Sequence, residues 1–296
     1  MPSRLLLAAL TVLALALPSA AQAAKPERSY YVSLGDSYAA GYQATGQGEG
    51  RTTRKGFAYQ LVGQAAKRGH RFELVNFGCA NVPGETSESI LKRKTACTYP
   101  TPGGEKYTGK TQATAAERFL RKNRGKVGLI TVSIGGNDVT ACAREADPVP
   151  CVVAALDRVK ANGKTLVKRL RKAAGKKVRI VGITYPDVIL GSWVSGLQAD
   201  RDLAALSVTA FKSLLNPALK EIYQSVGGRF VDVTTATDAY RPLDQTTTLA
   251  PHGEIPIAVA KVCELTYYCQ YRDIHPRTSG YKLIAELVAK TLPRKG

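Results

Sequence analysis

The sequence predicts an α/β protein in which helices cover both faces of a doubly wound, five-stranded parallel sheet, giving three layers. Short runs rich in Val, Ile, Leu and Tyr alternate along the chain with longer segments of helical periodicity. The runs show little polar alternation, which is typical of strands that are buried on both faces. Strands separated by helices pair in parallel through right-handed crossovers, so the alternation itself predicts the architecture.

Strands are predicted over residues 30–34, 72–76, 128–133, 177–184 and 229–233. Helices are predicted between and after them, over residues 57–67, 112–121, 152–170, 200–224 and 278–292. The third helix is the most distinct, because apolar residues or glycine recur on one side at helical spacing and Lys and Arg lie largely on the other.

Long connections are expected over residues 81–110 and 185–196, with a longer one over residues 234–272. The last is too long for a bare connector. We therefore expect it to form a rim of the functional site.

The N-terminus has the pattern of a secretory signal peptide. Arg4 is followed by an apolar run from Leu5 to Leu17 and by small residues that end at Ala23. The run is shorter than the roughly 20 residues that a membrane-spanning helix needs. We expect cleavage after Ala23, export from the cell, and a single domain over residues 24–296, a length that one α/β domain can fill.

The six cysteines predict three disulfides, because an even number in an exported chain is typical of a cross-linked protein. They fall into close pairs along the chain, so the expected bridges are Cys79–Cys97, Cys142–Cys151 and Cys263–Cys269. The spacing lacks the short Cys-x-x-Cys pattern of structural zinc sites, so no metal is expected.

The chain is strongly basic, with a formal net charge of +19. Removing the signal peptide removes only Arg4 and leaves +18. Such a charge favours contact with anionic lipid or acidic polysaccharide surfaces, or it serves to keep the protein soluble. The basic residues are not interleaved with aromatic residues, and we expect no nucleic-acid partner.

Four short motifs follow predicted strands or lie near the end of the chain. They are Gly35-Asp36-Ser37-Tyr38, Gly78, Gly135-Gly136-Asn137-Asp138 and Asp273-Ile274-His275-Pro276. The first three come directly after the first three strands. Because parallel strands end at one edge of a sheet, and ligands bind there, these residues are expected to converge.

These four blocks, in this order, resemble the SGNH (GDSL-type) hydrolase family, and in particular its secreted actinobacterial lipases and esterases. The resemblance implies a flavodoxin-like fold and cleavage of carboxylic esters through an acyl-enzyme. It implies no cofactor. A monomer acting on an ester or lipid substrate is expected.

Ser37 is the expected nucleophile, and a serine hydroxyl needs an adjacent base. The chain has three histidines. His70 precedes the second strand and belongs to the opposite edge of the sheet, while His252 lies in the predicted rim. His275 is therefore the expected general base.

The expected oxyanion donors are the backbone amides of Ser37 and Gly78 and the side-chain amide of Asn137. The resemblance assigns these roles to the glycine and asparagine blocks. The alternatives are an ordinary strand-end turn for Gly78 and a loop cap for Asn137.

The sequence leaves open which group orients the imidazole of His275. The common family pattern, Asp-x-x-His, has its acid three residues before the histidine, and that position here is Arg272. Asp273, two residues before His275, is favoured, and the backbone carbonyl of Arg272 is the alternative, which would leave a Ser–His dyad. Asp36 is expected to bond within its turn, and Asp138 to tether neighbouring loops.

The sequence leaves the substrate open. The apolar loop over residues 188–194 is expected either to form an acyl groove or simply to pack. A lipase or esterase, with phospholipase activity included, is favoured. The alternatives are a polysaccharide O-deacetylase and a non-catalytic, cationic envelope-binding protein.

Overall fold

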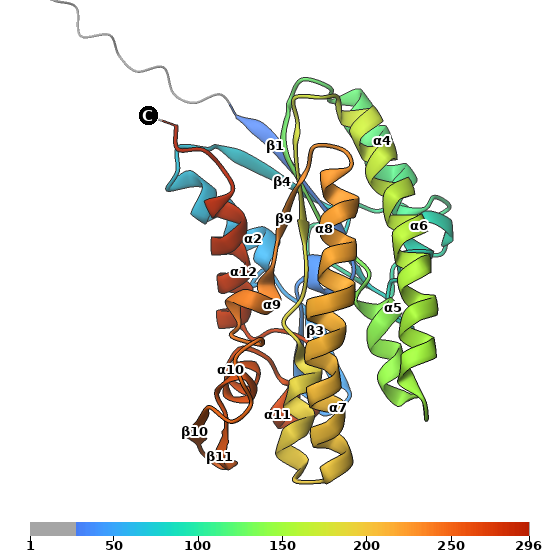
Figure 1. The fold of residues 1–296 in the computed structure, drawn as a ribbon. Coiled ribbons are helices and arrows are strands. Elements are labelled where there is room, and N and C mark those ends of the chain that lie inside the picture. The colour runs from blue at the N-terminus through green and yellow to red at the C-terminus, as the bar shows by residue number, and fades with distance from the viewer. Residues whose placement is uncertain (1–27, 296) are drawn as a thin grey trace, which may run out of the picture.

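A computed structural model describes residues 28–295, and the predicted signal peptide lies outside the described residues. Figure 1 shows a central sheet flanked by helices. Its five strands are all parallel, in the order β4-β1-β7-β8-β9. Their bounds are β1 (Ser29–Gly35), β4 (Phe72–Asn76), β7 (Val127–Ser133), β8 (Arg179–Ile183) and β9 (Arg229–Val231). The predicted fold class is confirmed.

The helices form a layer on each side of this sheet (Figure 1). One layer consists of α2 (Phe57–Ala66) and α12 (Thr278–Lys290), which pack against each other. The other consists of α4 (Gln112–Lys122), α6 (Pro148–Ala174) and α8 (Asn216–Gln224). The helix predicted over residues 200–224 is divided into α7 (Gln198–Thr209), a π-helical segment, η3 (Ala210–Leu215), and α8.

Helix α6 buries the face that the sequence predicts. Leu156, Val159 and Leu166 are buried. Gly163 lies on the same face, where an added Cβ atom would be 2.9 Å from Cδ1 of Ile222 on α8. A glycine at this point therefore lets α6 and α8 approach closely.

The strand order reverses between β1 and β7. From β1 the chain moves to β4 on one side of it and then returns to β7 on the other. In a doubly wound sheet this reversal leaves a crevice at the carboxyl ends of the two strands. Ser37 follows β1 and Asn137 follows β7, so the topology alone brings these two segments together.

Several elements outside the sheet are short. Helices α1 (Ser37–Ala40) and α5 (Gly136–Thr140) begin directly after sheet strands, and α3 (Ser89–Lys92) and η1 (Ala141–Arg144) lie in loops. Two small hairpins join β2 (Tyr42–Gly46) to β3 (Glu49–Thr52) and β5 (Cys79–Ala80) to β6 (Tyr99–Pro100). The sequence analysis missed these hairpins, because strands of two to five residues carry almost no periodicity.

The expected rim over residues 234–272 is structured. It contains α9 (Val233–Ala236), the hairpin β10 (Thr246–Leu249) and β11 (Gly253–Pro256), α10 (Ile257–Leu265) and α11 (Tyr268–Tyr271). Its apolar residues form a second core that is separate from the core around the sheet. The 3-10 helix η2 (Val188–Ser195) contributes Leu190, Trp193 and Val194 to this second core, so part of the apolar loop after β8 serves for packing, whereas Val188 and Ile189 border cavities.

Three disulfides are present, Cys79–Cys97, Cys142–Cys151 and Cys263–Cys269. Each one closes a segment next to a motif that the sequence analysis singled out. Across residues 28–295, no helix combines the length and the apolar character needed to cross a bilayer.

Packing at Gly182 generates a first prediction. An added Cβ atom at Gly182 on β8 would lie 1.9 Å from Cδ2 of Tyr223 on α8, which is buried. We expect Gly182→Ala to lower the free energy of unfolding by about 1–3 kcal/mol, because overpacking forces side chains from their rotamers. Urea unfolding measures this effect.

The control is Gly63→Ala in α2, where an added Cβ atom meets nothing within 4 Å. Alanine is preferred to glycine inside a helix, so this variant should gain roughly 0.5–1 kcal/mol. Equal stability of the two variants would contradict the packing argument.

Candidate active site

Ser37 is placed by a close contact between β1 and β7. Gly35 has φ of 136°, and a Cβ atom there would lie 2.0 Å from the carbonyl oxygen of Ser133. No other residue type fits this approach. The next residue, Asp36, caps α1 by accepting a hydrogen bond from the Tyr38 amide at 3.0 Å. Ser37 therefore stands in the first turn of a capped helix at the crevice, and it is half-buried.

Asp36 joins the ends of three strands. Its Oδ1 accepts hydrogen bonds from the Tyr38 amide and from Oγ of Ser133 at 3.2 Å, and its Oδ2 accepts one from the hydroxyl of Tyr185 at 2.6 Å. Burial raises the pKa of Asp36 to about 6, although the hydrogen bonds oppose the shift. Asp36 thus bonds within its turn, as expected, and does not contact the imidazole of His275 by a hydrogen bond.

His275 is oriented by Asp273. Oδ1 of Asp273 is 2.8 Å from Nδ1 of the ring and also accepts the backbone N–H of His275 at 2.9 Å. The bond from the His275 N–H to Oδ1 of Asp273 is an Asx turn, which folds the segment so that an acid only two residues away reaches the ring. The carboxylate of Asp273 therefore lies at Nδ1, where a backbone carbonyl would lie in a Ser–His dyad.

The electrostatics of Asp273 favour its ionised form. Burial acts to raise the pKa of Asp273, but the hydrogen bonds and charge of His275 outweigh it, and the pKa lies below its ordinary value. An ionised carboxylate holds the imidazole in one tautomer, with the proton on Nδ1 and Nε2 able to accept a proton.

The loop that carries His275 is tied at several points. The hydroxyl of Tyr38 donates to the carbonyl of Ile274 at 2.6 Å, and the amide of Tyr267 donates to the carbonyl of His275 at 3.0 Å. The ring of Tyr42 lies 4.5 Å from the imidazole between centroids. Tyr267 itself lies inside the loop closed by Cys263–Cys269, so this disulfide holds a segment that bonds to His275.

Ser37 and the histidine loop border the same small cavity. Ser37, Asn137 and Ile274 line it, and its volume is about 10 Å³, room for roughly one water molecule. Within residues 28–295 no hydrogen bond joins Oγ of Ser37 to His275. Catalytic hydrogen bonds are often long without substrate and tighten when it binds, so this arrangement is compatible with base catalysis.

Asn137 faces this cavity from α5. Its side-chain amide donates one hydrogen bond to the carbonyl of Glu85 at 2.8 Å. An amide nitrogen carries two hydrogens, so a second donor remains for a ligand. The bond to Glu85 fixes the direction of that donor.

The role expected of Gly78 requires correction. Its amide donates to Oδ1 of Asn76 at 2.8 Å, so this N–H is already committed inside the protein. A Cβ atom at Gly78 would be 2.6 Å from the backbone of Ala39 in α1. Glycine is needed here because the strand end packs directly against the helix of the nucleophile, and not because a substrate approaches.

Gly84 occupies the position that the sequence analysis assigned to Gly78. A Cβ atom at Gly84 would lie 2.7 Å from Oδ1 of Asn137, so its backbone lies against that side chain. In the described part of the chain no hydrogen bond occupies the Gly84 amide. The sequence pattern did not single out Gly84, because it lies in the loop over residues 81–110, six residues beyond the strand-end glycine. The available signal was that Gly84 is the first glycine of this loop.

Asp138 holds this loop in place. Its two carboxylate oxygens accept hydrogen bonds from the amide and the hydroxyl of Ser87, at 2.8 and 2.7 Å. Burial raises the pKa of Asp138, and the bonds to Ser87 oppose that shift. The expected tether between loops is therefore present, and it fixes Gly84 relative to Asn137.

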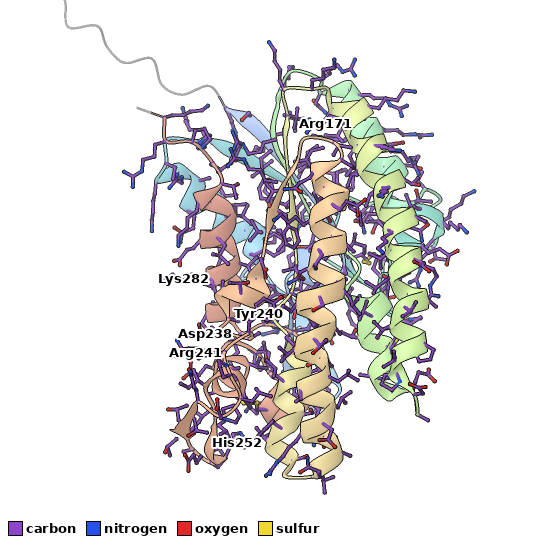
Figure 2. The ribbon with its side chains drawn as sticks, viewed as in Figure 1. Arg171, Asp238, Tyr240, Arg241, His252 and Lys282 are labelled. Atoms are coloured by element: carbon purple, nitrogen blue, oxygen red, sulfur yellow. A yellow bond between two sulfur atoms is a disulfide. The ribbon has the colours of Figure 1, made fainter. Side chains whose placement is uncertain are left out.

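The other two histidines lie away from the cavity. Nε2 of His70 is 2.7 Å from the carbonyl of Pro293, and burial lowers the pKa of this imidazole. His252 lies in the turn of the β10–β11 hairpin (Figure 2). His252 is near Cys263 and Cys269, but these sulfurs form a disulfide and are not thiolate ligands for a metal.

A larger groove opens beside the small cavity. Its volume is about 830 Å³, and it shares Asn137, Thr140 and Ile274 with the cavity at Ser37. This volume is within the range of small-molecule sites. The hydroxyl of Ser37, the amide donor of Asn137 and a groove therefore lie together at the carboxyl edge of the sheet, beside the loop that carries the oriented imidazole, and this set of groups is suited to acyl transfer.

Comparison with known proteins agrees with this geometry. The model of the GDSL-like lipase/acylhydrolase family matches residues 33–283. Among curated proteins no match is found.

Solved structures similar to this chain include a variant of an acetyl-xylooligosaccharide esterase from Geobacillus stearothermophilus. The identity is 17% and the TM-score 0.48, over 88% of this chain and 93% of the other. An aryl esterase from M. smegmatis is similar at 12% identity and a TM-score of 0.45, over 89% of this chain and 97% of the other.

The buried carboxyl of Asp36 generates a pH prediction. Its pKa is about 6 in the folded protein against an ordinary 3.8, so the folded state binds the proton more tightly than the unfolded state between these values. The contribution of Asp36 to stability is therefore present below about pH 4 and is lost as the pH rises through about 6. Urea unfolding of the wild type and Asp36→Asn at pH 4, 5, 6 and 7 measures the difference in free energy of unfolding.

We expect the difference, wild type minus variant, to fall between pH 4 and 6 and to be level above 7. A difference that stays constant or rises over this range would show that Asp36 ionises without penalty in the folded protein.

Proposed function

The chain belongs to the GDSL-like lipase/acylhydrolase family and is a carboxylic ester hydrolase, and from this premise we propose that it is a secreted lipase or esterase that works through an acyl-enzyme on Ser37. The observation that carries the proposal is the bond of 2.8 Å between Asp273 and His275, in a loop bonded to the helix of Ser37. We propose that this carboxylate and imidazole form a catalytic triad with the hydroxyl of Ser37 when substrate binds.

In the first step, Nε2 of His275 takes the proton of Ser37 while Oγ attacks the ester carbonyl. The imidazolium that forms is stabilised by the ionised carboxylate of Asp273. It then gives the proton to the leaving alcohol, which departs and leaves the acyl-enzyme. Water, activated by the same imidazole, hydrolyses this intermediate and restores the serine.

The negative charge of the tetrahedral intermediate needs donors at the cavity. We assign this role to the amides of Ser37 and Gly84 and to the side chain of Asn137. The support for Gly84 is its contact with Asn137 and its uncommitted N–H. Removing one such donor typically costs about 2.7–4 kcal/mol of transition-state stabilisation.

The two cavities favour different substrates. The groove of about 830 Å³ includes Ile189, Leu203 and Val82, and such a lining favours a lipid ester. The cavity at Ser37 is narrow, about 10 Å³, which disfavours a long acyl group there and supports a polysaccharide O-deacetylase as the second candidate. A non-catalytic envelope-binding protein is disfavoured, since an oriented Asp273–His275 pair serves no purpose in binding alone.

Secretion and domain organisation form part of the proposal. The pattern of the N-terminus predicts a signal peptide over residues 1–23, and three disulfides fit an oxidising compartment. A single hydrolase domain over residues 24–296 is supported by a family match that spans most of this range.

Hydrolysis of esters of graded acyl length tests the function. We expect the wild type to hydrolyse p-nitrophenyl esters, and Ser37→Ala to lose about 10⁴-fold or more in kcat, because no other group supplies the nucleophile. Preference for long chains supports the lipase, and activity confined to acetyl esters supports the deacetylase. Turnover by Ser37→Ala at the wild-type rate contradicts the acyl-enzyme.

The role of Asp273 has its own test. We expect Asp273→Asn to reduce kcat by about 10³–10⁴-fold with little change in KM, because an asparagine does not hold the imidazole in the productive tautomer. The matched control is Asp244→Asn, since Asp244 is exposed. A loss below about tenfold would indicate a Ser–His dyad instead.

A further inference from the structure

Three arginines line the groove beside the active site. Arg93 follows α3, Arg144 ends η1, and Arg272 follows α11. They come from three distant parts of the chain and meet only in the folded protein. The groove has one acidic lining residue, Asp200, so its formal charge is positive.

These arginines lack carboxylate partners. In the described part of the chain none of the three forms an ion pair, whereas Arg169 binds Glu117 at 2.7 Å. Arg171, at the top of Figure 2, donates to the carbonyls of its own helix end and neighbouring loops. In the groove, by contrast, Arg272 has the hydroxyl of Tyr268 as a neutral partner, and within residues 28–295 the three guanidinium charges are not balanced by ion pairs.

Glu85, the acid whose pKa the charge of Arg93 lowers, already has hydrogen-bond partners. Its carboxylate accepts hydrogen bonds from Asn81 and from Ser89, the latter at 2.8 Å. Burial raises the pKa of Glu85, while Arg93 and the hydrogen bonds oppose the shift. Glu85 is buried and Arg93 is only half-buried, so the guanidinium still faces the groove.

Two of the arginines stand on fixed segments. Arg144 follows Cys142, which is bridged to Cys151 at the start of α6. Arg272 follows α11, and its amide donates to the carbonyl of Tyr268 at 2.7 Å. The backbone from which these two side chains extend is therefore held in place.

We propose that Arg93, Arg144 and Arg272 form an anion subsite that binds the phosphate of a phospholipid ester while its ester bond lies at Ser37. The inference rests on the proposed function and names its substrate class. The groove adjoins the cavity at Ser37, because Asn137, Thr140 and Ile274 line both, so a phosphate held in the groove lies near the nucleophile.

The chemistry favours a phosphate over other anions. Guanidinium groups bind phosphate oxygens in a bidentate manner, and a phosphate offers acceptors to more than one of them. The apolar residues of the groove, such as Ile189 and Leu203, suit an acyl chain next to the phosphate. A phospholipid combines both features.

Monomeric substrates test the subsite without a contribution from surface charge. The wild type is assayed on dihexanoyl phosphatidylglycerol and on uncharged dihexanoylglycerol, both below their aggregation concentrations. The test variant is Arg93→Gln/Arg144→Gln, which spares Arg272 because it adjoins Asp273. Arg118→Gln on α4 is the control, since Arg118 is exposed and lies outside the groove.

We expect the double variant to lose about 10–100-fold in kcat/KM on the phosphatidylglycerol, mainly through KM, and to keep its activity on dihexanoylglycerol. The control should match the wild type on both. Inorganic phosphate should compete with the phosphatidylglycerol in the wild type and lose this effect in the double variant, which identifies the phosphate, and not the rest of the headgroup, as the group bound.

Equal losses on both substrates would overturn the subsite, because the arginines would then act on the fold or on catalysis. The subsite would also be overturned if the wild type showed no preference for the phosphate substrate. A loss by the double variant that is seen only with acetylated acidic oligosaccharides would overturn the subsite in favour of another anion. Failure of the proposed function would give a different result. Ser37→Ala would then hydrolyse dihexanoylglycerol at the wild-type rate.

Discussion

The buried carboxyl of Asp36 is the contact on which the arrangement of the site depends. It accepts hydrogen bonds from Tyr38 after β1, from Ser133 at the end of β7, and from Tyr185 after β8. Three neighbouring strand ends are thereby fixed to one another. The approach of Gly35 to Ser133 makes this possible, because any side chain at Gly35 would separate β1 from β7. The position of Ser37 is set by this junction of β1, β7 and β8.

Two carboxylates near the nucleophile have opposite environments, and this separates their roles. Asp36 is 1% exposed, and its pKa is raised to about 6 chiefly by burial. Asp273 faces an imidazole, and its pKa is lowered despite partial burial. Environments that move two pKa values apart favour different roles, a structural one for Asp36 and, in the proposed mechanism, orientation of the imidazole for Asp273. The same residue type thus meets two different demands at positions 36 and 273.

The loops around the crevice are held by side-chain bonds and disulfides more than by regular structure. Asp138 binds Ser87, and Asn137 binds the carbonyl of Glu85, so the loop after β4 is fastened to the helix after β7. Cys263–Cys269 closes the segment whose Tyr267 amide binds the carbonyl of His275. A site assembled from separate loops needs such tethers, because loops are otherwise the most mobile part of a fold.

The sequence by itself determined the sheet, the helices and the edge at which the site lies, because burial on two faces and helical periodicity are written in local residue patterns. It also singled out Ser37, His275 and Asn137, since residues after parallel strands must share one edge. The tertiary structure alone decided which glycine adjoins Asn137 and how an acid two residues from His275 reaches the ring. The first depends on Asn76 occupying the amide of Gly78, and the second on an Asx turn in which Asp273 accepts the backbone N–H of His275. Neither could be predicted from spacing alone, because the first follows from the packing of Gly78 against Ala39 and the second from the conformation that the folded loop adopts.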